Sequence, residues 1–304
     1  MPELQNIALI GASGTIGRPI LSALRAHPTF IPYVLNRQSS KSIYPRTRVI
    51  TIPDDLSVSE IAASLREHSI HALIIAIAGS HVSEQKRLID AALESGCVRR
   101  VIPAEFGSCD SADDETNSVL PLMKGKSEVR GYVEGVCEKS RGRLSWSSVV
   151  TGHFFDWGLG NGFLKYDVKS KKAWIVDGGD VRFSTSTLGF VADAVVRVLE
   201  REEGTRNRML YVQGLYVTQN EVLRELERVT GGKWEVVEQR SEKELEVLRP
   251  RMLEGDMEAR EEVVAIWGII RGDWTKKEGF ANELLGLKEE DLRSVVEEVV
   301  KSQA

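Results

Sequence analysis

Residues 7–17 read Ile-Ala-Leu-Ile-Gly-Ala-Ser-Gly-Thr-Ile-Gly, and this stretch decides the fold. Four apolar residues run into a glycine-rich turn, and apolar residues then recur at Ile16, Ile20 and Leu24, which is a helical spacing. A strand, a tight turn and a helix in that order form the setting in which a glycine-rich turn binds the pyrophosphate of a dinucleotide. We therefore expect the turn residues to contact such a cofactor: Gly11, Ser13, Gly14, Thr15, Ile16 and Gly17.

Each glycine of this turn has a physical role. Gly11 and Gly14 would let the backbone turn sharply and approach the phosphates, and Gly17 would let the helix pack close to the strand. The phosphates would then lie at the helix N-terminus, where unpaired N–H groups and the positive end of the helix dipole favour an anion.

Composition narrows the classes of function. A net charge of −5 and a pI near 5.7 give no general attraction to nucleic acid or to an anionic membrane. The longest nearly uninterrupted apolar stretch, residues 72–78, is far too short to span a bilayer, and the first residues show no signal-peptide pattern. The three scattered cysteines indicate neither a disulfide framework nor a metal site, so we expect a reducing, cytoplasmic setting.

Strand and helix patterns alternate through the first half of the 304-residue chain. The expected strands are 7–10, 30–35, 48–52, 71–78, 98–102 and 144–150, and the expected helices are 15–27, 56–68, 82–96 and 124–140. Near-continuous apolar strands between helices predict an α/β fold with a doubly wound parallel (Rossmann) sheet. Ligands of such sheets bind at the C-terminal ends of the strands.

The alternation breaks near residue 151, where phenylalanine and tryptophan gather. We therefore divide the chain into a nucleotide-binding domain, 1–152, and a smaller C-terminal α/β substrate lobe, 153–304, whose elements are partly interleaved with the first. In the second part we expect a helix at 190–201, a strand at 209–212, a helix at 218–229 and an amphipathic surface helix within 288–301.

Arg37 indicates which dinucleotide binds. Sites for NAD usually place an acidic residue at the end of the second strand to hold the ribose 2′-hydroxyl, whereas this chain has Asn36 and Arg37 there, with Lys41 close by. A guanidinium suits a 2′-phosphate, so the sequence predicts NADP(H), although an exposed arginine after a strand would look the same. Ala78 and Gly79, which follow the fourth strand, are also expected to contact the nucleotide.

Two aspartates follow the third strand, and their role stays open at this point. Asp54 and Asp55 occupy a position that often meets the adenine ring, but paired aspartates are also ordinary turn residues.

Lys126 is the candidate catalytic group. The apolar face of the helix at 124–140 runs through Val129, Val133, Val136 and Cys137, which lie three, seven, ten and eleven positions after this lysine. Lys126 therefore begins the buried stripe and is expected to point inward, while Lys124 and Glu128 point away. An inward lysine beside a ligand is suited to proton transfer, but its ammonium could equally reach past the apolar surface to water.

Several motifs together identify a family resemblance. They are Gly11-Ala-Ser-Gly-Thr-Ile-Gly17, Val98-Arg-Arg-Val-Ile-Pro-Ala-Glu-Phe-Gly-Ser108, Lys126-x-x-Val-Arg-x-x-x-Glu134, Thr151-Gly-His-Phe154 and Gly279-Phe-Ala-Asn-Glu-Leu-Leu-Gly-Leu287. The chain resembles the NmrA-like group of atypical short-chain reductases. Within that group it is most similar to the branch of isoflavone, pinoresinol–lariciresinol and phenylcoumaran benzylic ether reductases, including the branch's fungal members.

The resemblance implies an NADPH-dependent reductase of a small aromatic secondary metabolite, with Lys126 as the general acid or base. It places the nicotinamide beside residues 103–107 and 152–155, and the expected cofactor contacts there are Phe106, Gly152 and Phe154, together with Lys126. Candidate contacts to the aromatic substrate are His153, Phe155, Trp157 and Trp267, although the same aromatic residues could belong to the core. Two alternatives remain: an NADP-sensing regulator without turnover, and a non-reducing isomerase or cyclase. Members of the group occur as monomers and as homodimers.

Overall fold

A seven-stranded sheet forms the centre of the first unit of the computed structural model, which describes residues 3–303. The strand order is β11-β6-β5-β4-β1-β2-β3, and β1 pairs in parallel with both β2 and β4. The strands are β1 (Asn6–Ile10), β2 (Ile31–Arg37), β3 (Arg48–Ile52), β4 (Ala72–Ile75), β5 (Arg100–Ile102), β6 (Ser145–Val150) and β11 (Arg208–Tyr211). The order of the first six is that of a dinucleotide-binding sheet, so the predicted Rossmann fold is confirmed.

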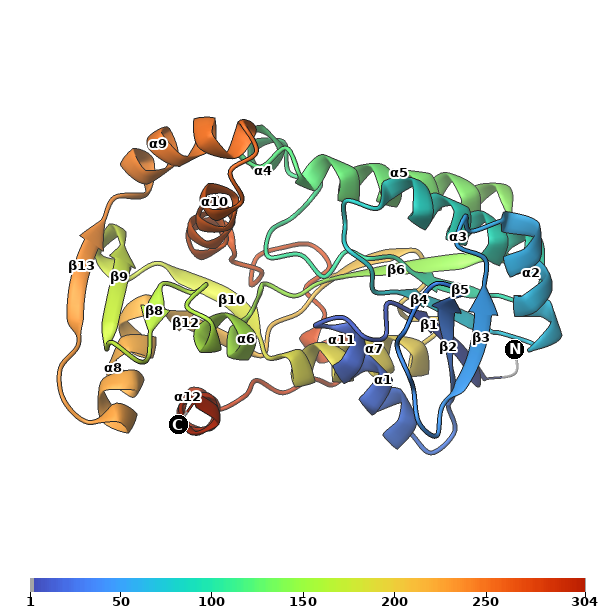
Figure 1. The fold of residues 1–304 in the computed structure, drawn as a ribbon, viewed down its shortest axis with the longest axis horizontal. Coiled ribbons are helices and arrows are strands. Elements are labelled where there is room, and N and C mark those ends of the chain that lie inside the picture. Colours follow the sequence, from blue (N-terminus) through green and yellow to red (C-terminus); the bar gives the residue numbers. More distant parts are fainter. Residues whose placement is uncertain (1–2, 304) are drawn as a thin grey trace. The chain divides into compact units, whose positions relative to one another are not determined.

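Helices cover both faces of this sheet (Figure 1), as the near-continuous apolar strands require. In Figure 1, α2, α3 and α5 lie on one side and α1 and α7 on the other. Their bounds are α1 (Gly17–Ala26), α2 (Val58–Glu67), α3 (Val82–Ser95), α5 (Met123–Lys139) and α7 (Leu188–Glu200). These helices lie within a few residues of the predicted ranges. Gly96 is the C-cap of α3 and adopts φ 70°, a left-handed conformation that favours glycine.

Alternate residues of the strands supply the two hydrophobic layers. Ile10, Leu35 and Ile75 pack on one face with Leu88 of α3 and Val133 of α5. This alternation of inward-facing positions fixes the register of the parallel strands. The C-terminal ends of β1, β2 and β4 are thereby brought to one edge of the sheet.

Arg100 in β5 is a buried charge within this unit. Its guanidinium donates to the hydroxyls of Ser145 at 2.9 Å, Ser147 at 2.7 Å and Thr205 at 2.9 Å, and to the carbonyl of Glu202. Burial lowers the pKa of Arg100 to about 10, so the side chain stays charged at neutral pH. Four acceptors offset the cost of its desolvation and tie β5 to β6 and to the segment after α7.

The second unit contains two small sheets, with the orders β12-β10-β7 and β13-β9-β8. Their strands are β7 (His153–Phe154), β8 (Tyr166–Asp167), β9 (Lys172–Val176), β10 (Arg182–Ser186), β12 (Leu215–Thr218) and β13 (Glu235–Gln239). The helices are α4 (Asp114–Val119), α6 (Phe155–Gly160), α8 (Gln219–Thr230), α9 (Ser241–Leu253), α10 (Met257–Arg271), α11 (Asn282–Leu285) and α12 (Leu292–Gln303), with a 3-10 turn at Asp177–Gly179. The predicted amphipathic helix near the C-terminus is α12, whose Val295, Val296 and Val299 are buried.

Both units are discontinuous in sequence. The first consists of Met1–Phe106, Pro121–Val149 and Val191–Leu210, and the second of Gly107–Leu120, Val150–Phe190 and Tyr211–Ala304. The predicted division at residues 152 and 153 stays a prediction. In the part of the chain that the structure describes, no helix is both long enough and apolar enough to cross a membrane.

Candidate functional site

The turn between β1 and α1 is packed too tightly for side chains at two of its glycines. Gly11 adopts φ 84°, and a Cβ at this position would lie 2.3 Å from the carbonyl oxygen of Ala76. A Cβ on Gly17 would lie 2.0 Å from the carbonyl oxygen of Gly11. The turn therefore needs glycine at both positions to bring the start of α1 against the ends of β1 and β4.

The N-terminus of α1 is open to an anion. Ile16 occupies the N-cap position without a side-chain hydrogen bond, and the first turn of the helix contains no acidic residue. Ser13, Gly14 and Thr15 are exposed beside it, whereas Ile16 is buried. Uncapped N–H groups next to an exposed glycine turn fit the pyrophosphate of a dinucleotide.

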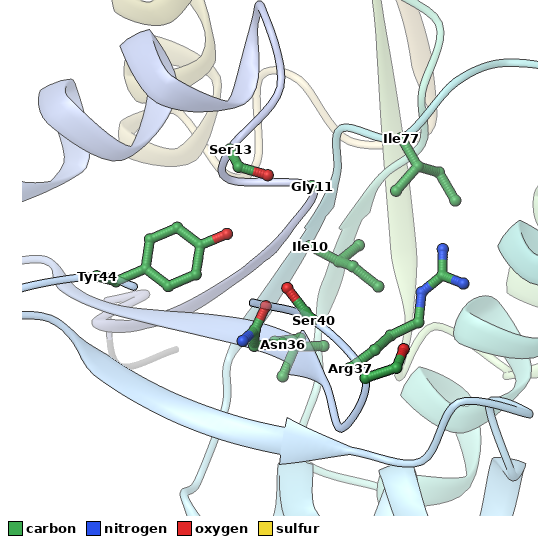
Figure 2. Close-up of a pocket in the computed structure, with 10 residues that line it drawn as sticks. Ile10, Gly11, Ser13, Asn36, Arg37, Ser40, Tyr44 and Ile77 are labelled. Atoms are coloured by element: carbon green, nitrogen blue, oxygen red, sulfur yellow. The ribbon is translucent and has the colours of Figure 1, made fainter. Parts of the chain in front are cut away.

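A cavity of about 280 Å³ lies beside this turn, at the C-terminal ends of β1 and β2. Figure 2 shows Ser13 of the turn on one side and Asn36, Arg37 and Ser40 on the other. The lining residues are Ile10, Gly11, Ser13, Leu35, Asn36, Arg37, Ser39, Ser40, Tyr44 and Ile77. The cavity therefore joins the predicted phosphate-binding turn to the predicted 2′-phosphate residue, at the edge of the sheet where such cofactors bind.

The two candidate cations differ in position. Arg37 lines the cavity, and its guanidinium has no hydrogen bond or ion pair with residues 3–303, so it can donate to an anion. Lys41 is exposed and does not line the cavity. The geometry thus favours Arg37 as the partner of a 2′-phosphate, and contact by Lys41 stays a prediction.

The sequence reasoning missed four lining residues that lie outside the strands. Ser39, Ser40 and Tyr44 lie in the polar run after β2, and Ile77 follows β4. The sequence could have indicated Ser39, Ser40 and Tyr44, because a polar run after a parallel strand lies at the ligand-binding edge of the sheet. Of the predicted pair after β4, Ala78 is exposed and Gly79 is partly buried.

Lys126 points inward, as the helical spacing predicted. The residue is partly buried, and its Nζ donates to the backbone carbonyl of Glu105, whereas Lys124 and Glu128 are exposed. A Cβ added at Gly79 would lie 3.1 Å from Cε and 3.3 Å from Cγ of Lys126. The stem of the lysine therefore lies over the backbone that follows β4, and its ammonium lies near the end of β5.

The carbonyl that accepts from Lys126 belongs to a tightly folded segment. Ala104 N–H donates to Oε1 of Gln85 at 3.1 Å, and Glu105 N–H donates to the carbonyl of Pro103 at 2.8 Å. The side chains of Gln85 and Glu105 are buried, and Phe106 adopts φ 30°. No pattern in the sequence singled out Gln85, because a polar residue on the buried face of α3 breaks the apolar spacing rather than following it.

The remaining site residues of the prediction belong to the second unit. Gly152 adopts φ 71°, and its Cβ would lie 2.1 Å from the carbonyl oxygen of Ser184, while the neighbouring Phe154 is partly buried in β7. Phe155 lies in the hydrophobic core, and Trp157 is 41% exposed. Trp267 is buried, and its indole N–H donates to the hydroxyl of Thr116 at 3.0 Å. Contacts of these residues with cofactor or substrate stay predictions.

His153 is buried between β10 and α10. Its Nε2 lies 3.2 Å from the carbonyl oxygen of Ala265, and its ring packs edge-on against Phe163 with centroids 5.3 Å apart. Burial lowers the pKa of His153 to about 4, so the imidazole is neutral near pH 7 and donates from Nε2. The predicted contact between His153 and the substrate is untested.

We expect this histidine to make the protein less stable in acid. Because the pKa of His153 is lower in the folded state, the unfolded state binds the proton first as the pH falls. The free energy of unfolding should therefore decrease between about pH 6.5 and pH 4, by up to about 3 kcal/mol, and level off below. Urea unfolding of the wild type and of His153→Gln across this range measures the difference. Parallel pH dependences of the two proteins would contradict the assignment.

Residues 3–303 offer neither a metal site nor a nucleophilic thiol at Cys137. No group of three or more histidine, cysteine, aspartate or glutamate side chains that could hold a metal ion occurs there. The cysteines Cys97, Cys109 and Cys137 are free of disulfides, and burial raises the pKa of the Cys137 thiol to about 12. That thiol is therefore not a nucleophile near neutral pH.

A family model and curated relatives match this chain. The model of the NmrA-like family matches residues 3–278. Oxidoreductase aprR of Aspergillus flavus is 30% identical over 300 residues, which covers 97% of this chain and 99% of that protein. Phenylcoumaran benzylic ether reductase IRL1 of Ginkgo biloba is 28% identical over 142 residues, covering 42% of this chain and 44% of that protein.

Solved structures share the fold over nearly the whole chain. The leucoanthocyanidin reductase of Vitis vinifera in its binary complex with NADPH has a TM-score of 0.78 and 18% identity, and the match covers 97% of this chain and 99% of that chain. A crystal structure of isoflavone reductase has a TM-score of 0.76 and 20% identity, covering 98% and 99%. The fold, the glycine turn and the match to the family model lead to one conclusion: this chain belongs to the NmrA-like family.

Proposed function

We propose that the protein is an NADPH-dependent oxidoreductase that reduces a small aromatic secondary metabolite, with Lys126 as the general acid or base. The observation that carries the proposal is the cavity that joins the β1–α1 turn to Arg37. The relatives support the reaction class, because those compared above are named oxidoreductases or reductases.

The residues of the first unit fit NADP(H). The uncapped N-terminus of α1 and the close approach at Gly11 suit a pyrophosphate, and Arg37 supplies a guanidinium for the 2′-phosphate. Tyr44 and Ile77 offer flat and apolar walls to the adenosine portion. When bound, NADPH supplies the hydride.

In the proposed reaction, Lys126 donates or accepts the proton. Its Nζ is held by the carbonyl of Glu105, and its stem lies against Gly79, so the ammonium occupies a fixed position near the ends of β4 and β5. That edge of a parallel sheet is where the ligands of such folds bind. A proton held at one place can be delivered to a developing alkoxide or carbanion without reorganisation.

Arg37→Ala tests the cofactor assignment directly. We expect the wild type to bind NADPH at least about tenfold more tightly than NADH, which corresponds to about 1.4 kcal/mol. The substitution should remove this preference while leaving NADH affinity nearly unchanged, because NADH lacks the 2′-phosphate. Calorimetric or fluorescence titration with both cofactors measures the ratio.

Two matched variants complete this experiment. Arg25→Ala removes an exposed arginine from the last turn of α1 and should leave the ratio unchanged. Lys41→Ala tests the second candidate cation: a loss in this variant with no loss in Arg37→Ala would place the 2′-phosphate at Lys41 instead. Equal affinities of the wild type for NADPH and NADH would overturn the cofactor proposal. A wild type that prefers NADPH then justifies screening aromatic substrates by the oxidation of NADPH.

A further inference from the structure

Asp54 accepts hydrogen bonds from the turn that follows Arg37, although it is not itself among the residues that line the cavity. Asp54 follows β3, and its Oδ1 accepts from the backbone N–H of Ser39 at 3.2 Å and from the hydroxyl of Ser39 at 2.6 Å. Ser39 lies two residues after Arg37 and lines the cavity. One carboxylate oxygen therefore occupies both hydrogen-bond donors of a residue that faces the nucleotide site.

The carboxylate of Asp54 is ionised at neutral pH. The hydrogen bonds from the side chain and the backbone of Ser39 lower its pKa, and the nearby charge of Arg37 lowers it further. Backbone N–H and hydroxyl groups are also the donors that phosphate oxygens use in proteins. Asp54 is thus an exposed anion of the protein itself, beside the place where the 2′-phosphate of NADPH would bind.

Backbone hydrogen bonds fix the turn that follows β2. Ser40 N–H donates to the carbonyl of Arg37 at 3.0 Å, and Gln38 N–H donates to the carbonyl of Ile52 in β3 at 3.0 Å. These bonds keep Arg37, Ser39 and Ser40 in place independently of the charge of Asp54. Removing that charge should therefore change the electrostatics of the site without releasing the turn.

We propose that Asp54 is a specificity-determining residue that limits the preference for NADPH, by holding the donors of Ser39 and by placing a negative charge next to the 2′-phosphate. This inference rests on the proposed function, because it assigns the Arg37 cavity to NADP(H). Repulsion between Asp54 and a bound 2′-phosphate opposes the attraction by Arg37, while a cofactor with a 2′-hydroxyl is unaffected by it. The protein then binds NADPH selectively but less tightly than Arg37 alone would permit.

Asp54→Asn separates the charge of this residue from its hydrogen bonds. Asparagine keeps an oxygen that accepts from Ser39, so the turn is retained while the negative charge is lost. We expect the affinity for NADPH to rise about threefold at an ionic strength of about 20 mM and the affinity for NADH to stay the same. The gain should shrink at about 300 mM salt, because exposed charges are then screened.

Asp55→Asn is the matched control. Asp55 is the next residue and carries the same charge, but its Oδ1 accepts from the N–H of Ser57 at 3.1 Å and does not contact Ser39. We expect this variant to change the ratio of NADPH to NADH affinity by clearly less than Asp54→Asn does. An equal change in the ratio for both variants would overturn the proposal, because the effect would then be one of net charge.

The measurement is titration of each full-length variant with NADPH and with NADH at both salt concentrations. A ratio that is unchanged or lower in Asp54→Asn, with a circular dichroism spectrum like that of the wild type, overturns the role of Asp54. A different result, a wild type that does not prefer NADPH over NADH, would contradict the proposed function. The two failures are therefore distinguishable in one set of titrations.

Discussion

Lys126→Ala should lower kcat for reduction of the aromatic substrate by roughly 10²- to 10⁴-fold, the range that a positioned proton donor contributes. The affinity for NADPH should stay similar, because the cavity that joins the glycine turn to Arg37 lacks Lys126 among its lining residues. The reason for the loss is geometric: the Nζ of Lys126 is held by the carbonyl of Glu105, and alanine leaves no proton donor at that place.

Lys124→Ala is the control for this result. Lys124 lies on the same helix and is exposed, so its removal should leave kcat unchanged. Turnover of Lys126→Ala at the wild-type rate would eliminate the acid–base role. The measurement follows NADPH absorbance together with product formation, which also tests the alternatives. Product formed without net loss of NADPH would indicate an isomerase or cyclase, and binding of NADPH without any product would indicate a regulator.

Gly17→Ala should cost about 3 kcal/mol of folding stability and abolish tight nucleotide binding. A Cβ on Gly17 would lie 2.0 Å from the carbonyl oxygen of Gly11, which is a backbone atom, so the start of α1 has to move. Alanine is intrinsically better than glycine in a helix by about 1 kcal/mol, but this gain is smaller than the cost of the displacement.

Gly14→Ala provides the comparison in the same turn. Its Cβ would lie 3.2 Å from the carbonyl oxygen of Gly11, a contact that a shift of a few tenths of an ångström relieves. In urea unfolding and NADPH titration, Gly14→Ala should therefore have a stability and an affinity close to those of the wild type. Gly17→Ala should have clearly lower values of both. Similar losses in both variants would mean that the whole turn, rather than the close approach at Gly17, limits stability.

The first unit could be predicted from the sequence because its strands are buried on both faces. Runs such as 7–10 and 72–75 are apolar throughout, and helices with apolar residues at a period of 3.6 separate them. Right-handed crossovers then give a doubly wound sheet. The inward direction of Lys126 followed from the spacing of Val129, Val133 and Val136 by the same argument.

The small strands of the second unit could not be predicted in this way. β7 and β8 contain two residues each, and β13 has no fully buried residue. None of these three strands therefore shows a periodic apolar pattern. The short helices α4 and α6 contain six residues each and were missed for the same reason. β7 and β13 are extended through pairing with segments that are distant in sequence, β10 and β9 respectively.

Within the candidate site, sequence reasoning identified the residues whose type is unusual for their position. Arg37 stands where an acidic residue is expected, and glycine recurs at residues 11, 14 and 17, so both features were visible. Ser39 and Gln85 are common residue types, and their roles depend on contacts with Asp54 and Ala104 that are distant in sequence. Such contacts leave no local pattern.

The buried Arg100 has a consequence for the folding of the chain during its synthesis. Two of its four acceptors, Thr205 and the carbonyl of Glu202, lie about a hundred residues downstream, in the last segment of the first unit. During synthesis the guanidinium therefore lacks these partners until residues 202–205 have left the ribosome. The seven-stranded sheet, although it begins near the N-terminus, becomes complete only when two thirds of the chain has been made.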